Sequence, residues 1–282
     1  MAMTHTRTTR IQLPQMALGG LSENWLFKES GDLHWDMISS HMGVAIDEVR
    51  DAQGTRLLPV FARISVDASE PIGSFKENAV CELTGSASPV DDMTFISDVV
   101  LRSGSKRIDV RLMTFFAQRT RDNGLIPGRP PRSAMPAPVR AHEGHSAFHD
   151  EFMALRRDKR SCEWAPGFSC IYELNPYYDV NGACLLYFAS YAPIHDFCER
   201  RYIHGLARAR GMRMDADWGL EASTLTRDVF YFGNCRVNDS LVFELDACEP
   251  TSDGRIRVAS SIFRKSDGVR IARTFVVKQL ES

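Results

Sequence analysis

The chain contains two long stretches that resemble one another. The first is GGLSENWLFKESGDLHW, from Gly19 to Trp35, and the second is NPYYDVNGACLLYFASY, from Asn175 to Tyr191. Each places a short cluster of acidic and amide residues before an aromatic-rich run with helical spacing, and about four strand-like alternations follow each. The sequence therefore predicts an internal duplication of a unit made of one helix and an antiparallel sheet, which is an α+β architecture.

The first unit is expected to begin with a helix over Leu21 to Met42. Ser22 and Asn24 are residue types that cap helix N-termini, and Gly31 is expected to interrupt or loosen the helix. Beyond the helix, apolar residues alternate with polar ones, which is typical of strands with one buried face. The predicted strands are Val60–Val66, Phe75–Leu83, Phe95–Leu101 and Ile108–Phe116.

The second unit repeats this order. A strand over Phe168–Leu174 is expected to lead to a helix from about Gly182, and Pro193 is expected to bend or end that helix. Leu185, Phe188, Ala189 and Ala192 would share its buried face. The strands predicted after it are Thr224–Phe232, Leu241–Ala247, Ile256–Phe263 and Ile271–Val277.

A stretch of different composition separates the two units. From Arg119 to Arg160 there are nine Arg or Lys residues against five Asp or Glu, with the passage PGRPPRSAMPAP at the centre. Such composition resists regular structure, so residues 1–118, 119–167 and 168–282 are predicted to be the first unit, a connector and the second unit. The connector is either a solvated linker or a source of arginines that hold phosphates or an acidic partner surface.

Composition narrows the classes of function. The net charge of −2, from 34 basic and 36 acidic residues, gives no field that favours nucleic acid. No apolar run approaches the roughly 20 residues that span a bilayer, and MAMTHTRTTR lacks the apolar core of a signal peptide, so a cytoplasmic protein without a membrane partner is expected. The seven cysteines form no C-x-x-C pair, which predicts reduced thiols and no metal site.

The two long motifs, at Leu18 to Trp35 and Asn175 to Tyr191, resemble the double-hotdog proteins of polyketide and related biosynthetic clusters. The family is typified by the bifunctional acyltransferase/decarboxylase of the leinamycin pathway. The resemblance implies a double hotdog, in which two curved antiparallel sheets each wrap a central helix. It also implies acyl thioester substrates carried by coenzyme A or an acyl carrier protein, with malonyl or methylmalonyl groups transferred and decarboxylated, and no cofactor beyond the pantetheine carrier.

One departure from the family bears on the mechanism. The resemblance would place an acylated tyrosine in the first half, but that region reads LLPVFARISVD, and the first tyrosine of the chain is Tyr172. A tyrosyl ester at that position therefore cannot be carried over.

The candidate site residues cluster at the two expected helix starts. In a hotdog the thioester carbonyl meets free N–H groups at the start of the central helix, where they stabilise an oxyanion or enolate. Asp179 could act as a base, Asn181 could donate to the carbonyl, and His34 suits proton transfer near neutral pH, although capping and core packing are the alternatives for each. Catalysis is assigned to Glu23, Asn24, His34, Asp179 and Asn181, and substrate binding to Ser22, Trp25, Gly182, Ala183, Tyr187, Tyr191 and Tyr231.

The leading hypothesis is an enzyme that transfers or decarboxylates the acyl group. A thioesterase or a hydratase/dehydratase, with Asp179, Glu23 or His34 as base, is the first alternative, and a non-catalytic acyl-carrier-binding protein is the second. No serine lies in a G-x-S-x-G elbow, and no glycine-rich dinucleotide loop occurs. Whether two chains pair as a homodimer is left open.

Overall fold

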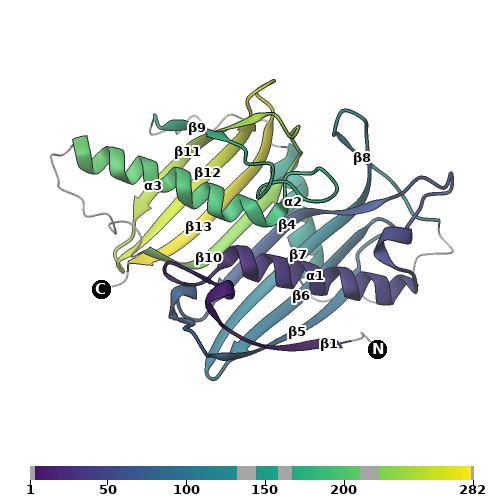
Figure 1. The fold of residues 1–282 in the computed structure, drawn as a ribbon, viewed down its shortest axis with the longest axis horizontal. Coiled ribbons are helices and arrows are strands. Elements are labelled where there is room, and N and C mark those ends of the chain that lie inside the picture. The colour runs from purple at the N-terminus through teal and green to yellow at the C-terminus, as the bar shows by residue number, and fades with distance from the viewer. Residues whose placement is uncertain (1–3, 132–143, 158–166, 210–221, 281–282) are drawn as a thin grey trace.

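A computed structural model describes residues 4–131, 144–157, 167–209 and 222–280. Its centre is one antiparallel sheet in which ten strands follow the order β1-β5-β6-β7-β4-β10-β13-β12-β11-β9, and β8 pairs with β7 outside that path. Figure 1 shows α1 and α3 on the same face of this sheet. The strands of the first half are β1 Thr4–Arg10, β4 Leu58–Ala68, β5 Val80–Pro89, β6 Thr94–Ser103, β7 Lys106–Arg119 and β8 Leu125–Pro127.

The second half has the same construction. Its strands are β9 Ser169–Glu173, β10 Ala222–Tyr231, β11 Ser240–Pro250, β12 Arg255–Arg264 and β13 Arg270–Leu280. Reading outward from the β4–β10 pair, β7, β6, β5 and β1 of the first half correspond to β13, β12, β11 and β9 of the second. The duplication predicted from the sequence is therefore present as two five-stranded halves, which share backbone hydrogen bonds where β4 meets β10.

The first central helix, α1, runs without interruption over Glu23–Met42. Ser22 caps its start, since the Ser22 Oγ accepts a hydrogen bond of 3.3 Å from the Trp25 N–H, and Gly43 ends it with a left-handed φ of 68°. The predicted interruption at Gly31 is wrong. A Cβ at Gly31 would lie 2.5 Å from the Phe188 Cζ, so the glycine permits close approach of an aromatic ring.

The second central helix, α3, covers Tyr191–Ala209 and begins later than predicted. Residues 181–187 form a loop, and a short 3₁₀ turn over Phe188–Ser190 precedes the helix. Pro193 therefore lies in the first turn instead of ending the helix. Proline is tolerated there because the first helical N–H groups have no partner within the helix.

Several elements of the structure were not predicted. The edge strand β1 pairs with β5, and β8 and the helix α2, over His145–Arg157, lie within the predicted connector. Phe148 and Phe152 of α2 pack with Phe230, whereas the neighbouring Val229 packs with α1 and α3, so α2 covers the opposite face of the sheet. Residues 132–138 of the proline-rich passage lie outside the described residues, and the boundaries at 118 and 168 stay a prediction.

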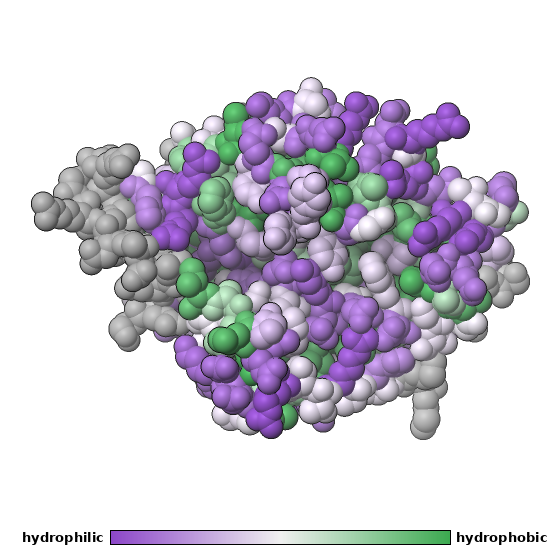
Figure 2. Space-filling model, in the orientation of Figure 1, coloured by the Kyte–Doolittle hydropathy of each residue, from purple (hydrophilic) through white to green (hydrophobic). Residues whose placement is uncertain are grey.

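Most predicted strands are found within a few residues of their expected ends. The exception is the strand that was expected to start at Phe75. That residue follows the 3₁₀ turn Ile72–Ser74, and β5 begins at Val80. None of the described helices is long and apolar enough to span a membrane. Figure 2 shows a largely hydrophilic surface over α1 and α3, with hydrophobic residues in small groups.

Candidate functional site

Two cavities lie beside the predicted site residues, and the larger one, at the start of α3, has a volume of about 580 Å³. Trp35, Phe61 and Phe188 form an aromatic wall, with ring centroids 5.9 Å apart for the first pair and 3.9 Å for the second. Lys28 and Arg56 add two exposed cations to the lining. Of the predicted site residues, Asn181, Gly182, Ala183, Tyr187, Tyr191 and Tyr231 line this cavity.

The loop before α3 is shaped by two polar side chains. The Asp179 Oδ2 accepts hydrogen bonds from the Asn175 N–H at 2.8 Å and the Tyr172 hydroxyl at 3.1 Å, and Asp179 is only 6% exposed. The Asn181 Oδ1 accepts from the backbone N–H groups of Ala183 and Leu185. The Asn181 Nδ2 has no partner within the described part of the chain, so this amide can donate to a ligand.

Tyrosine hydroxyls supply the other donors. Tyr231 donates to the Phe188 carbonyl at 3.0 Å, whereas the Tyr191 hydroxyl has no partner among the described residues. Burial raises the pKa of Tyr191 and of Tyr231 well above the ordinary value. Burial, with the charge of Asp32, also raises the pKa of Tyr187. These hydroxyls therefore stay protonated at neutral pH and act as donors.

The second, smaller cavity lies at the start of α1 and has a volume of about 300 Å³. The predicted residues Ser22, Glu23 and Asn24 line it, but each already has a partner. The Asn24 Nδ2 donates to the Ala189 carbonyl at 2.8 Å, and the Glu23 carboxylate is held by Thr224 and Arg227. Trp25 lines neither cavity and packs against the core.

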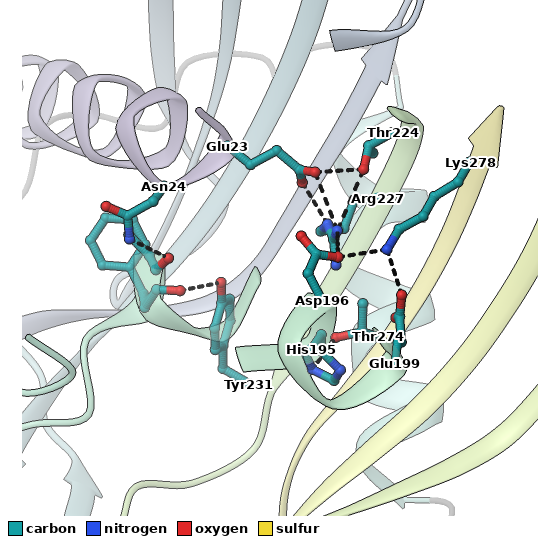
Figure 3. Close-up of polar contacts among 12 residues, drawn as sticks. Glu23, Asn24, His195, Asp196, Glu199, Thr224, Arg227, Tyr231, Thr274 and Lys278 are labelled. Atoms are coloured by element: carbon teal, nitrogen blue, oxygen red, sulfur yellow. Dashed lines mark hydrogen bonds and ion pairs between the residues drawn. The ribbon is translucent and has the colours of Figure 1, made fainter. Parts of the chain in front are cut away.

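A chain of charged side chains joins α1, β10, α3 and β13 (Figure 3), and four of its members line the smaller cavity, namely Glu23, Asp196, Glu199 and Lys278. Glu23 of α1 contacts Arg227 of β10 at 2.5 Å, Arg227 contacts Asp196 of α3 at 2.7 Å, and Asp196 contacts Lys278 of β13 at 2.6 Å. Lys278 also donates to Glu199. Burial raises the pKa of Glu199, whereas at Asp196 the charges of Arg227 and Lys278 outweigh burial and lower the pKa.

His34 lies between α1 and the sheet and lines neither cavity. Its Nδ1 contacts the Ser97 Oγ, its Nε2 lies 2.8 Å from the Thr114 Oγ1, and burial lowers its pKa to about 3. A buried imidazole that stays neutral and is paired at both nitrogens is placed for packing, so the geometry does not support its predicted role in proton transfer.

The second half contains a matching histidine that the sequence analysis missed. His195 of α3 lies 2.8 Å from the Ser260 Oγ and 2.7 Å from the Thr274 Oγ1, on the strands that correspond to those of Ser97 and Thr114. Burial, with the charge of Arg227, lowers its pKa to about 3. His195 is thus the counterpart of His34, which places the true register of the duplication a few residues later than the motif alignment.

Sequence reasoning also missed the charged chain, and it did not assign the exposed cations Lys28 and Arg56 to the larger cavity. Arg227 stands among buried apolar residues of a predicted strand, and Asp196 and Glu199 are three apart on one helix. A charge at a core-facing strand position was the one signal that could have pointed to this cluster.

Comparison with known proteins identifies the fold. No protein-family model and no curated protein sequence matches the chain. Solved structures do: one described as an oleoyl thioesterase from Lactobacillus plantarum matches with a TM-score of 0.64 and 11% identity, over 99% of this chain and 96% of its own. A 12:0-ACP thioesterase from Umbellularia californica matches with a TM-score of 0.65 and 11% identity, over 99% and 98%. An acyl-ACP thioesterase from Bacteroides thetaiotaomicron matches with a TM-score of 0.59 and 12% identity, over 98% of both chains.

These full-length matches confirm the predicted fold class. The chain is an α+β protein of the double-hotdog type, with a helix packed against each half of a large antiparallel sheet. At such low identity they establish the fold, and the reaction has to be argued from the cavities.

Proposed function

We propose that the protein is an enzyme that processes acyl thioesters carried by coenzyme A or an acyl carrier protein. The observation that carries the proposal is the larger cavity, which combines an aromatic and aliphatic lining with unpartnered donors on Asn181 and Tyr191. A cavity of about 580 Å³ with such a lining is typical of a site for a small organic ligand. The solved structures with the same fold, which are described as thioesterases, support this class of substrate.

The donors have the chemistry that a thioester reaction requires. An amide N–H and a neutral hydroxyl, held in a largely apolar cavity, stabilise the negative charge that develops on the carbonyl oxygen. Because burial keeps Tyr191 protonated, its hydroxyl can serve as such a donor. The exposed Lys28 and Arg56 suit the phosphate groups of coenzyme A or of a carrier's pantetheine arm.

Hydrolysis is the first candidate reaction, because the compared enzymes are described as thioesterases. A water molecule would attack the carbonyl carbon and lose a proton, and the carbon–sulfur bond would break to give an acid and a thiol. Asp179 is the base that the sequence suggested; it does not itself line the larger cavity, although its neighbours Tyr178 and Val180 do, and its Oδ2 is held by Asn175 and Tyr172.

Decarboxylation is the second candidate, and a specific observation favours it. Among the described residues that line the larger cavity there is no Asp, Glu, His or Cys. Loss of carbon dioxide from a malonyl or methylmalonyl thioester needs no base, and the resulting enolate is stabilised by the same donors that stabilise an oxyanion. Acyl transfer would require an additional acceptor nucleophile.

The reactions are separated by incubating the protein with acetyl, malonyl and methylmalonyl thioesters of coenzyme A and of a carrier protein. Intact-mass measurement of the carrier distinguishes release of the free thiol, loss of carbon dioxide with the thioester retained, and transfer between carriers. If every thioester is returned unchanged while the carrier still binds, the protein is a binding protein and the proposal is wrong.

Two variants assign the chemistry. Asp179→Asn should lower hydrolysis by about a hundredfold, as expected for the loss of a general base, and leave decarboxylation nearly unchanged. Gly182→Trp should abolish either reaction, because a Cβ there has no neighbour within 4 Å and the ring can fill the cavity. Gly205→Trp is the matched control, since Gly205 is exposed, has equal space and lines neither cavity.

A further inference from the structure

Three loops meet at the side chain of Asn123. This residue lies in the turn 120–124 between β7 and β8 of the first half and is 8% exposed. Its Nδ2 donates to the Cys184 carbonyl at 2.7 Å, in the loop before α3, and to the Cys235 carbonyl at 2.6 Å, in the segment after β10. One side chain of the first half therefore ties two loops of the second half together.

Asn234, which follows β10, holds the loop before α3 at a second point. Its Oδ1 accepts a hydrogen bond of 2.8 Å from the Leu186 N–H, and its Nδ2 donates to the Asn123 carbonyl at 3.2 Å. Asn234 is 6% exposed and lines the larger cavity. The two asparagines are thus bonded to each other, and together they hold the loop on either side of Leu185.

The loop that they hold carries Asn181, whose Nδ2 has no partner in the described part of the chain. The Asn181 Oδ1 accepts from the N–H groups of Ala183 and Leu185 at 3.0 and 3.1 Å, and the Asn181 N–H donates to the Leu185 carbonyl at 2.9 Å. Because the oxygen of this amide is bonded to the loop, the direction of its free Nδ2 depends on where the loop lies. The contacts of the two asparagines fix that position.

The backbone at this contact is unusual. Among the described residues other than glycine, a left-handed φ is found at Asn78, Asn123 and Cys184, with values of 67°, 63° and 55°. The last two of these residues are hydrogen-bonded to each other. The Asn123 Oδ1 is also buried without a partner among the described residues. Both features cost stability, and such features are typical of functional sites.

We propose that Asn123 is a positioning residue of the larger cavity, which holds the loop 181–187, together with Asn234, so that the Asn181 amide points at the thioester carbonyl. This role rests on the proposed function, which supplies the thioester. Trp35 and Lys28 of α1 and the lining residues of β4 would stay in place if the loop shifted. A shift is therefore expected to slow the reaction more than it weakens substrate binding.

Asn123→Gly tests this role, because glycine adopts the left-handed φ and removes only the side-chain contacts. With the thioester that the wild type consumes fastest, kcat should fall by about tenfold or more, whereas KM should change by less than about threefold. Asn123→Asp, which keeps the shape but sets a carboxylate oxygen against two carbonyl oxygens, should lower kcat at least as far. Asn78→Gly is the matched control and should keep wild-type kinetics, since Asn78 is exposed, has the same left-handed φ and lines neither cavity.

Hydrogen exchange gives a measurement that does not depend on turnover. The N–H groups of Leu185 and Leu186 are hydrogen-bonded within the clamped loop. They should exchange about tenfold faster in Asn123→Gly than in the wild type, while the amides of β12 keep their wild-type rates. This pattern would show that the loop loosens while the sheet stays intact.

The outcomes separate this inference from the proposed function. If the wild type turns over a thioester and Asn123→Gly keeps the wild-type kcat per folded molecule, or changes KM alone, the positioning role is wrong and the proposed function stands. Faster exchange in β12 as well as in the loop would mean that Asn123 stabilises the whole fold, which also overturns the inference. If the wild type acts on no thioester, the proposed function falls, and the positioning role falls with it.

Discussion

At the scale of single residues, His34 and His195 show how the duplication is built. Each imidazole lies under its central helix and contacts a serine and a threonine on two adjacent strands. The pairing satisfies two hydroxyls that would otherwise be buried without partners. It also requires the imidazole to be neutral, because burial strongly disfavours its charged form.

The two histidines predict how stability depends on pH. Their ordinary pKa of 6.5 falls to about 3 in the folded protein, so between these values the unfolded chain binds protons that the folded chain does not. The stabilisation is complete above pH 6.5 and is lost as pH falls toward 3, by about 1.4 kcal/mol per pH unit for each histidine.

Urea unfolding at about pH 7 and about pH 5 checks this expectation, because the slope reports the difference in bound protons. The double variant His34→Gln/His195→Gln should be less stable at neutral pH but should lose less stability on acidification. Parallel losses in wild type and variant would mean that the histidines titrate normally in the folded state.

At the scale of elements, the sequence predicted the strands better than the second helix. Alternation is a local signal, and it located most strands of both halves to within a few residues. The start of α3 was misplaced because Leu185, Phe188 and Ala189 have helical spacing but face a cavity and the core from a loop and a 3₁₀ turn. A proline is found both in the first turn of a helix and just after its last residue, and Pro193 lies in the first turn of α3.

Only part of the candidate site could be predicted from the sequence, and the reason is physical. Sequence motifs showed which loops carry polar residues, and Asn181 and the three tyrosines that were assigned to the site line the larger cavity. The Glu23–Arg227–Asp196 contacts join α1, β10 and α3, which are far apart in the chain. No local pattern reports such long-range pairing, and the same holds for the contact between His34 and its two strands.

Gly31 supplies a prediction at the element scale. Alanine normally stabilises a helix relative to glycine by about 0.5–1 kcal/mol, but here its Cβ would meet Phe188 at 2.5 Å and Phe61 at 3.1 Å. Gly31→Ala should therefore destabilise the protein by about 1–3 kcal/mol, as overpacking does.

Gly205→Ala is the control within α3, where the added methyl group meets nothing within 4 Å and should be neutral or stabilising. Chemical denaturation of both variants gives the comparison. Equal stabilisation by the two substitutions would show that the aromatic wall yields without cost.

At the scale of the whole molecule, the two halves are joined by more than the β4–β10 ladder. Arg63 of β4 pairs with Asp228 of β10 at 2.6 Å and lies over the ring of Phe148, 3.9 Å from its centroid. On the other face, Glu23 of the first half is paired with Arg227 of the second. Helix α2, which follows the first half in the chain, thus covers the junction, and the halves are expected to unfold together.

Arg227 tests this coupling because it is fully buried and contacts elements of both halves. Arg227→Met leaves Glu23 and Asp196 without their guanidinium partner, which should cost about 3–5 kcal/mol. Adding Glu23→Gln removes one of the stranded charges, so the double variant should be more stable than the sum of the single losses predicts. Calorimetry should find one transition, with equal calorimetric and van't Hoff enthalpies, in every variant.

Arg107→Met, in an exposed pair with Asp109, is the control and should cost about 1 kcal/mol or less. A second transition, with only one of the two affected by Arg227→Met, would mean that each half is stable without the other.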